Sequence, residues 1–107
     1  MRTEAGRDWL AYIMGDGTDG DAGSGAMAPA DYVGLSANGD ALTGSETTLT
    51  GEIAADGLER AQAVFAHTDG QDSYTLTKTF TYTGAGVTVR KVGIFNAATD
   101  GVMPFIA

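Results

Sequence analysis

Cysteine is absent from this chain of 107 residues, and proline occurs only twice, against 16 glycines. Without cysteine, neither a disulfide framework nor a thiolate metal site can form. Stability must therefore come from packing within the chain or from association with other chains. Apolar residues make up 43% of the chain, a globular rather than a disordered profile. A chain of this length forms one domain over residues 1–107, and it buries roughly two-thirds of its unfolded surface.

Basic residues are also scarce, with six Lys and Arg against 14 Asp and Glu, for a formal net charge of −8. An acidic chain repels phosphate groups, so no direct binding to nucleic acid or to an anionic membrane is expected. No apolar run approaches the length of a membrane span. The N-terminal residues 1–8 carry acidic side chains and lack an apolar core, unlike a signal peptide. These features predict a protein that is made in a cytoplasm and starts at Met1.

The most regular pattern lies at residues 73–83, where threonine alternates with larger side chains. Side chains of a strand alternate between its two faces, so the pattern predicts a long strand with a threonine face and a largely aromatic face. Threonine suits a strand face that meets water or a neighbouring subunit. The threonine face consists of Thr75, Thr77, Thr79, Thr81 and Thr83, and the other face of Tyr74, Leu76, Lys78, Phe80 and Tyr82.

Shorter elements are predicted on either side of this strand. Residues 3–14 have the apolar spacing of a helix, with Thr3 as its N-cap and Gly15 at its end. Residues 15–30 are rich in glycine and small side chains and are expected to form a flexible loop. For residues 43–57 we favour a short helix ending near Gly57, although an extended segment at 48–50 fits the pattern too.

Further strands are expected at residues 32–36, 58–67, 87–95 and 102–107. Residues 58–67 also have helical spacing, but the short glycine-containing connection at 68–72 favours a hairpin with the threonine strand. Apolar residues change parity near Lys91, which indicates a bulge or a strand covered on both sides. The fold class is therefore mainly β: a small antiparallel β-sandwich of about five to seven strands with one N-terminal α-helix.

Candidate sites for chemistry are few, and a structural role is favoured for each. Asp16, Asp19 and Asp21 could hold Ca²⁺, but the spacing of a calcium loop is not met, so a solvated acidic loop is preferred. His67, the single histidine, has no nucleophile signature near it and is expected to be a hydrogen-bonded turn residue. The glycine pairs at 15–17 and 84–86 are too short to cradle phosphate and lack the expected lysine.

Carboxylates and aromatic residues offer two further possibilities. Acidic pairs among Glu52, Asp56 and Glu59 could serve glycoside hydrolysis, but carboxylates are common in so acidic a chain. A sugar platform could use Trp9, Tyr12 and Tyr32, although Trp9 at helical spacing is more often a core anchor. The core or an interface is expected to hold Tyr74, Phe80 and Tyr82. No catalytic, cofactor-binding or metal-binding residue is therefore predicted.

Three segments of the chain resemble, in the same order, small structural proteins of tailed bacteriophages. In those proteins an E-I-x-x-x-G-L-x-R-A segment precedes a Y-T-L-x-K-T-F-T strand, and a K-x-G-[IL]-F-N-A-A segment follows. These correspond to residues 52–61, 74–81 and 91–98 of this chain, the last through Lys91, Gly93, Ile94, Phe95, Asn96, Ala97 and Ala98. The A-G-R-D-W sequence at residues 5–9 is also similar to the opening of such proteins.

This resemblance implies a non-enzymatic virion protein that needs no cofactor, is assembled in the host cytoplasm and is present in multiple copies as a capsid decoration or minor capsid protein. The alternatives are a tail, tail-fibre or baseplate protein, or an adhesion module that binds host glycans. The implied partners are a major capsid or tail protein and further copies of the chain, in trimers or higher rings. It also implies that another chain completes the strand at residues 102–107, or that the chain continues beyond Ala107.

Overall fold

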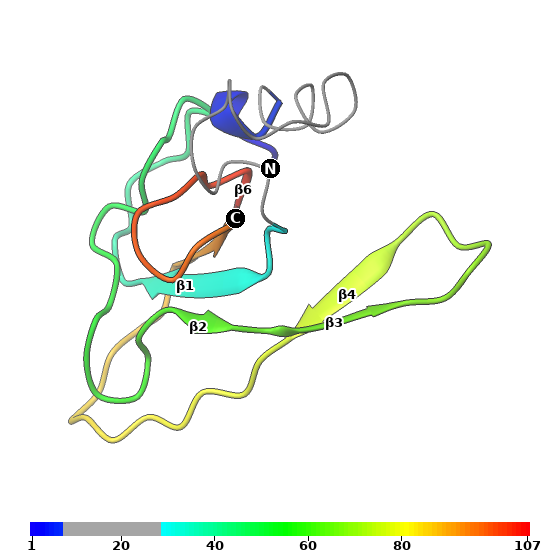
Figure 1. The fold of residues 1–107 in the computed structure, drawn as a ribbon. Helices are drawn as coiled ribbons and strands as arrows, with labels where there is room; N and C mark the ends of the chain where they lie inside the picture. Colours follow the sequence, from blue (N-terminus) through cyan, green and yellow to red (C-terminus); the bar gives the residue numbers. More distant parts are fainter. Residues whose placement is uncertain (8–28) are drawn as a thin grey trace.

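In a computed structural model of the protein, residues 1–7 and 29–107 are described, and they form two antiparallel sheets and one short helical turn (Figure 1). The larger sheet has four strands in the order β2–β1–β5–β6, namely β1 (Tyr32–Ser36), β2 (Ala61–Gln62), β5 (Lys91–Phe95) and β6 (Phe105–Ile106). The smaller sheet is a hairpin of β3 (Val64–His67) and β4 (Tyr74–Thr77). The predicted mainly β, antiparallel fold with an N-terminal helix is confirmed.

The centre of the larger sheet is a close approach of β1 and β5. Gly34 lies opposite Gly93 in the antiparallel register. A methyl group at either glycine would lie 3.0 Å from Cε2 of Phe95. The missing side chains therefore leave the space that the Phe95 ring occupies, and Phe95 is only 2% exposed.

The core lies on this side of the sheet. Leu49, Met103 and Ile106 pack with Phe95 into one buried cluster, and Tyr32 and Leu42 pack against it half-buried. Burial of these side chains stabilises the fold by about 1.5–3 kcal/mol each. Val92 and Ile94 are half-buried on the opposite parity of β5. The change of parity near Lys91 therefore belongs to a central strand that is covered on both sides, one of the two predicted explanations.

The outer edge of β6 is occupied by the N-terminal residues (Figure 1). Arg2 pairs with Phe105, and the N–H of Ile106 donates to the carbonyl of Met1 at 2.8 Å. Because Phe105 also pairs with Ile94 of β5, it has a strand neighbour on both sides. The edge at which another chain was expected to complete the strand is filled by the chain itself.

A helical turn at residues 4–7 follows this edge. Thr3 caps it as predicted, since its Oγ1 accepts from the N–H of Gly6 at 2.9 Å and donates to the carbonyl of Met103 at 2.6 Å. Thr3 is fully buried. The rest of the predicted helix, with Trp9 and Tyr12, lies outside the described residues, as does most of the predicted loop at 15–30.

The predicted helix within residues 43–57 is wrong. The segment is irregular, and its backbone is left-handed at Gly51, Asp56 and Gly57, which a helix cannot accommodate. Tertiary hydrogen bonds hold a turn at Thr50 and Gly51, closed by the N–H of Glu52 donating to the carbonyl of Leu49 at 3.0 Å, beside the end of β1. Ser36 Oγ donates to the carbonyl of Thr50 at 2.6 Å, and Glu52 forms a bridge with Ser36.

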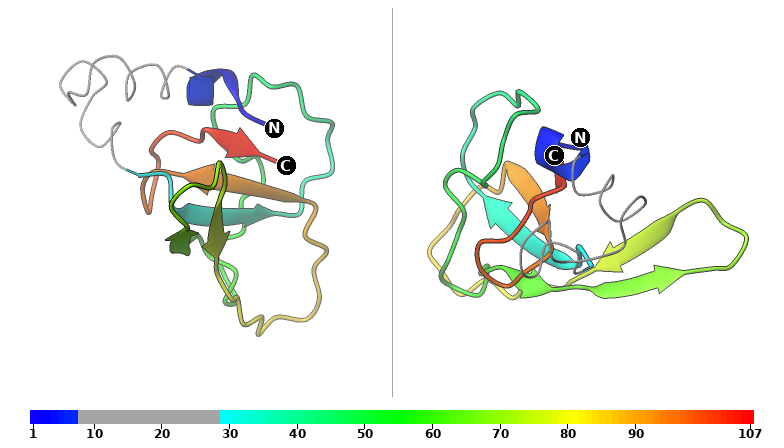
Figure 2. Two further views of the ribbon diagram at one scale, coloured as in Figure 1. Left: turned by 90° about the vertical axis from the view of Figure 1, so that its right-hand side faces the viewer. Right: turned by 45° about the horizontal axis from the view of Figure 1, so that its top comes forward.

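The remaining predicted strands exist but are shorter than expected. The segment at 58–67 is interrupted at Ala63, because β2 pairs with β1 whereas β3 pairs with β4. The threonine strand is paired only over β4, the strand predicted at 87–95 begins at Lys91, and the strand predicted at 102–107 is limited to β6. The hairpin itself is confirmed, with Phe65 opposite Leu76 and His67 opposite Tyr74. It extends away from the larger sheet (Figure 2).

Candidate functional site

A polar cluster centred on Arg60 joins three segments of the chain. The guanidinium donates to both carboxylate oxygens of Glu52, from Nε at 2.8 Å and from Nη2 at 2.7 Å. Its Nη1 donates to the carbonyls of Asp100 at 2.8 Å and Ala97 at 3.2 Å. The Arg60 side chain is 10% exposed, so these bonds form with little competition from water.

The same guanidinium lies over the ring of Phe95, with Cζ 3.4 Å from the ring centroid. A cation above an aromatic face is attracted by the negative charge density of that face. Phe95 in turn occupies the space left by Gly34 and Gly93. One arginine therefore connects the buried core of the sheet to an ion pair at its surface.

The loop after β5 is closed so that it presents its carbonyls to Arg60. Asn96 Oδ1 accepts from the N–H of Val102 at 2.7 Å, and the N–H of Asn96 donates to the carbonyl of Val102 at 3.1 Å. Asp100 has a left-handed backbone with φ of 52°, which turns the chain back toward β6. Three segments of the chain resemble phage structural proteins, and two of them, residues 52–61 and 91–98, thus meet around Arg60.

This geometry gives Glu52 a structural role, because both of its oxygens are engaged by Arg60. Glu59 lies with Glu52 on the wall of an open cavity of 440 Å³. Asp56 is exposed in a turn and does not line that cavity. Of the three carboxylates considered for glycoside hydrolysis, Glu52 and Glu59 therefore share a cavity, and the Glu52 carboxylate in it is held by Arg60.

His67 lies at the exposed end of the β3–β4 hairpin. Its Nδ1 is hydrogen-bonded to the carbonyl oxygen of Ser73 at 2.9 Å, across the connection between the strands. It is hydrogen-bonded, as expected, but it is the last residue of β3 rather than a residue of the turn. The shallow hollow beside it has a volume of 220 Å³, and its lining includes Gln71 and Thr75.

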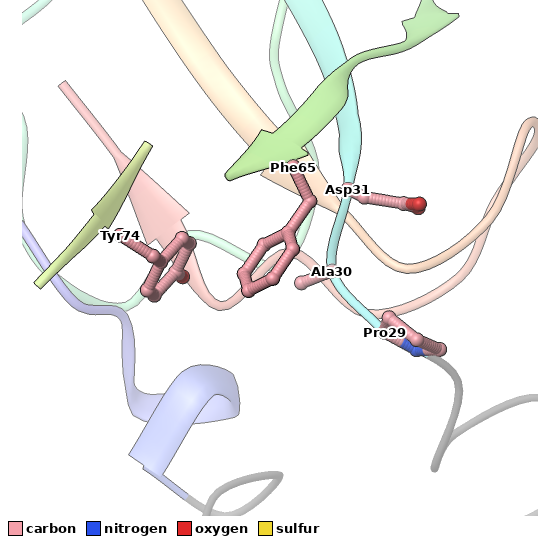
Figure 3. Close-up of a pocket in the computed structure, with 5 residues that line it drawn as sticks. All are labelled: Pro29, Ala30, Asp31, Phe65 and Tyr74. Carbon is pink, nitrogen blue, oxygen red and sulfur yellow. The ribbon is translucent and has the colours of Figure 1, made fainter. Parts of the chain in front are cut away.

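An apolar pocket of 450 Å³ lies where the hairpin meets the chain before β1 (Figure 3). It is lined by Pro29, Ala30, Asp31, Phe65 and Tyr74. The rings of Phe65 and Tyr74 have centroids 5.4 Å apart and are tilted by 39°. Both rings are about half exposed, at 59% and 49%. The pocket is a second place where apolar surface is available.

Among the aromatic residues considered for a sugar platform, Tyr32 does not line this pocket. Tyr32 packs against the core cluster instead, and Trp9 and Tyr12 lie outside the described residues. The Tyr82 hydroxyl accepts from the N–H of Gly86 at 2.7 Å, which gives it a local role in the bend at 84–86. Of the aromatic residues on the threonine strand, Tyr74 is at a potential interface, and Phe80 is half-buried.

Within residues 1–7 and 29–107, no three acidic or histidine side chains are grouped so that they could hold a metal ion. Asp16, Asp19 and Asp21 lie outside these residues. The described part of the chain also contains no helix that is long and apolar enough to cross a bilayer. The charged groups that do come together are those around Arg60.

Searches of protein-family models, curated proteins and solved structures found no match to this chain. The sequence did not predict the arrangement around Arg60, because two of the acceptors are backbone carbonyls, which no side-chain pattern reveals. The available signal was the resemblance, in which Glu52 and Arg60 belong to one segment and Phe95, Asn96 and Ala97 to another.

Proposed function

We propose that this protein is a non-enzymatic structural component of a tailed-phage virion, present in multiple copies as a capsid decoration or minor capsid protein. The observation that carries the proposal is the cluster around Arg60. Two of the three segments that resemble phage structural proteins, residues 52–61 and 91–98, contact each other there through an ion pair, a stacked ring and the carbonyl of Ala97. Such an arrangement supports a role in holding a shape rather than in binding a small molecule.

The charge of the chain agrees with this role. A net charge of −8 keeps many copies soluble and directs them away from packaged DNA. The partners would be a major capsid protein and further copies of the chain. The first alternative is a tail, tail-fibre or baseplate component, which has the same physical requirements.

Purified particles test the proposal. Particles from a lysate of the source are banded on a density gradient, and the chain is quantified by mass spectrometry relative to the major capsid protein. We expect the chain in the particle band, at many copies per particle. Its absence from particles, with the free chain present in the same lysate, would refute the proposal.

Location is tested on the same particles with gold-labelled antibodies in the electron microscope. Label over the shell supports the capsid assignment, whereas label along the tail or at the baseplate selects the first alternative. The exposed bend at residues 84–86 is a suitable epitope.

The second alternative is an adhesion module for host glycans, favoured by the half-exposed rings beside the apolar pocket. Aromatic rings commonly stack on sugar faces. Glycan arrays probed with the wild type and with Tyr74→Ala would test it. Specific binding that is lost in a folded Tyr74→Ala variant would favour adhesion over a purely structural role.

A further inference from the structure

The β3–β4 hairpin and the chain that follows it present an unusually open strand surface. All residues of β3 are exposed, and β4 is exposed except at Leu76, which is half-buried. Within the described residues, β4 pairs with β3 alone, so its outer edge has no strand partner. An isolated two-stranded hairpin is only marginally stable in water, and an open edge is a template for another strand.

Beyond β4 the chain continues as an arm over residues 78–90, exposed except at the half-buried Phe80, the yellow trace that leaves β4 in Figure 1. It is held at two points. The N–H of Thr83 donates to the carbonyl of Asp56 at 2.9 Å, and the N–H of Arg90 donates to that of Ser36 at 2.8 Å. A methyl group at Gly57 would collide with the carbonyl oxygen of Thr81. The turn at 56–57 therefore covers one side of the arm near Thr81 and Thr83.

The opposite side of the arm is the free one. Backbone groups alternate between the two sides of an extended strand. Because those of Thr81 and Thr83 face the turn at 56–57, those of Lys78, Phe80 and Tyr82 face away from it. The free edge of β4 thus continues along the arm, with outward N–H and C=O groups on the even-numbered residues.

Charge makes this edge suitable for a second copy of the same chain. Residues 73–90 contain no Asp or Glu, although the chain has 14 of them, and their charged side chains are Lys78 and Arg90. Elsewhere the acidic surface of one copy repels that of another. The arm is therefore the stretch of strand where two copies can approach with the least repulsion.

We propose that two copies of this chain pair through residues 76–82, as antiparallel strands related by a two-fold axis at Thr79. In this register Thr77 of one copy lies opposite Thr81 of the other, Leu76 opposite Tyr82, and Lys78 opposite Phe80. Threonine thus pairs with threonine on one face, and apolar side chains pair on the other, with the lysine against an aromatic ring. No charged residue faces its own counterpart.

The hydrogen bonds of this pair follow from the outward groups. Lys78 and Phe80 would exchange both backbone hydrogen bonds across the axis. Thr79 would then be a non-hydrogen-bonded pair with itself, in which the Cα atoms are about 4.5 Å apart. That separation lies within the range that a disulfide can span, about 4.4–6.8 Å. The geometry of this contact does not depend on the proposed function. Its biological purpose rests on that function, because a shell protein present in many copies uses contacts between copies.

A single introduced cysteine tests the register, because the chain has no cysteine of its own. Thr79→Cys is compared with Thr47→Cys, which is exposed and lies outside the hairpin and arm. Under mild oxidation the rate of disulfide-linked dimer formation is measured on non-reducing gels. We expect Thr79→Cys to cross-link at least about tenfold faster, since pairing raises the effective concentration of the thiols. Equal rates would overturn the proposal.

A second pair of variants tests the backbone hydrogen bonds without cysteine. Lys78→Pro removes an outward N–H from the edge, whereas Lys78→Ala removes only the side chain. The molecular mass of each, in full-length form, is measured by light scattering over a concentration series. We expect dimers for the wild type and Lys78→Ala, and monomers for Lys78→Pro with unchanged circular dichroism.

Three results would overturn the contact: a wild type that stays monomeric, a dimer that survives Lys78→Pro, or a larger ring without preferential linkage at position 79. Binding of the monomer to a capsid protein through this arm would likewise assign the edge to a different partner. The particle test is separate. A monomer that is found on particles contradicts this contact alone, whereas a dimer absent from particles contradicts the proposed function alone.

Discussion

Arg60 illustrates how one side chain can replace several weaker contacts. Its planar fork matches the Glu52 carboxylate, while its remaining donor reaches carbonyls 37 and 40 residues further along the chain. Its flat face covers Phe95. Lysine could supply the charge but neither the fork nor the stacking surface. The guanidinium is therefore required by geometry and not by charge alone.

We predict that Arg60→Lys lowers the free energy of unfolding by about 2 kcal/mol or more, because lysine keeps the charge but loses the stacking on Phe95 and cannot supply donors to both Glu52 oxygens and to the two carbonyls. Urea denaturation followed by fluorescence measures the change. Arg7→Lys is the matched control at an exposed position and should stay within about 0.5 kcal/mol of the wild type. Equal stabilities for the two variants would show that the fork contributes little.

Glu46 provides a pH-dependent contact with Thr43 and Gly44, in the loop between β1 and β2. Its carboxylate accepts from the N–H of Thr43 at 2.6 Å and from that of Gly44 at 2.8 Å. These bonds, chiefly that of Thr43, lower the pKa of the Glu46 carboxyl. A lowered pKa in the folded state means that the contribution to stability is present above the pKa of the unfolded chain and is lost as the pH falls through the folded value.

We therefore predict that Glu46→Gln destabilises the protein at pH 7 and that its difference from the wild type shrinks as the pH falls below about 4.3, the ordinary pKa of glutamate. Denaturant titrations of both proteins at pH 7 and at lower pH measure this difference. Glu59→Gln is the control, since its exposed carboxylate accepts no hydrogen bond within the described residues. A gap that is independent of pH would assign the effect of Glu46 to packing.

At the scale of elements, the turn at residues 56–57 determines where the arm leaves the body. Gly57 has φ of 87°, and a methyl group there would meet the carbonyl oxygen of Thr81. Gly70, in the hairpin connection, has the same φ of 87° but open space around it. The two glycines thus share the conformational strain that alanine would introduce and differ in the steric contact.

We predict that Gly57→Ala is more destabilising than Gly70→Ala by about 1–3 kcal/mol, the usual penalty for a backbone shift that relieves overpacking. The midpoints of urea denaturation give the difference. Proteolysis at the arm adds a local measure, because release from the turn should speed cleavage at Lys78 in Gly57→Ala only. Identical behaviour of both variants would mean that the arm does not depend on this turn.

The sequence predicted elements well where local pattern and tertiary pairing agree. The strand at 32–36 has the predicted bounds, because β5 pairs with all five of its residues and β2 with the first two. Residues 78–83 alternate as regularly as β4 does, but they have no strand partner in the described structure. Alternating side chains indicate that a segment can form a strand with two distinct faces. They do not indicate whether another strand is present to pair with it.

The same reasoning explains the errors. Leu49 and Ile53 have helical spacing, but the segment forms a turn at residues 50–51 that is held by Ser36, which lies 14 residues before Thr50. Glu52 was singled out as a possible acid, and it is important for a different reason. Its partner Arg60 belongs to the same segment of the family resemblance, whereas the carbonyls of Ala97 and Asp100 carry no side-chain signal at all.

For the whole molecule, net charge opposes the contact between copies that the arm favours. Each copy carries a formal charge of −8 at pH 7. Repulsion between two such copies reaches about 30 Å at 0.01 M salt but only about 8 Å at 0.15 M. The arm contributes hydrogen bonds and apolar contacts, which salt of moderate concentration leaves almost unchanged.

We therefore predict that added salt strengthens self-association, with the dissociation constant falling at least about threefold between 0.01 and 0.15 M NaCl as repulsion is screened. Analytical ultracentrifugation at pH 7 measures it. The opposite dependence would be expected if Lys78 and Arg90 bound the carboxylates of another copy, because salt weakens opposite-charge contacts. Lys78→Glu separates the two cases. In the proposed register it adds repulsion that salt screens and removes the lysine–Phe80 contact, so its affinity should rise with salt but stay below that of the wild type, whereas an ion-paired contact would stay broken at every salt concentration.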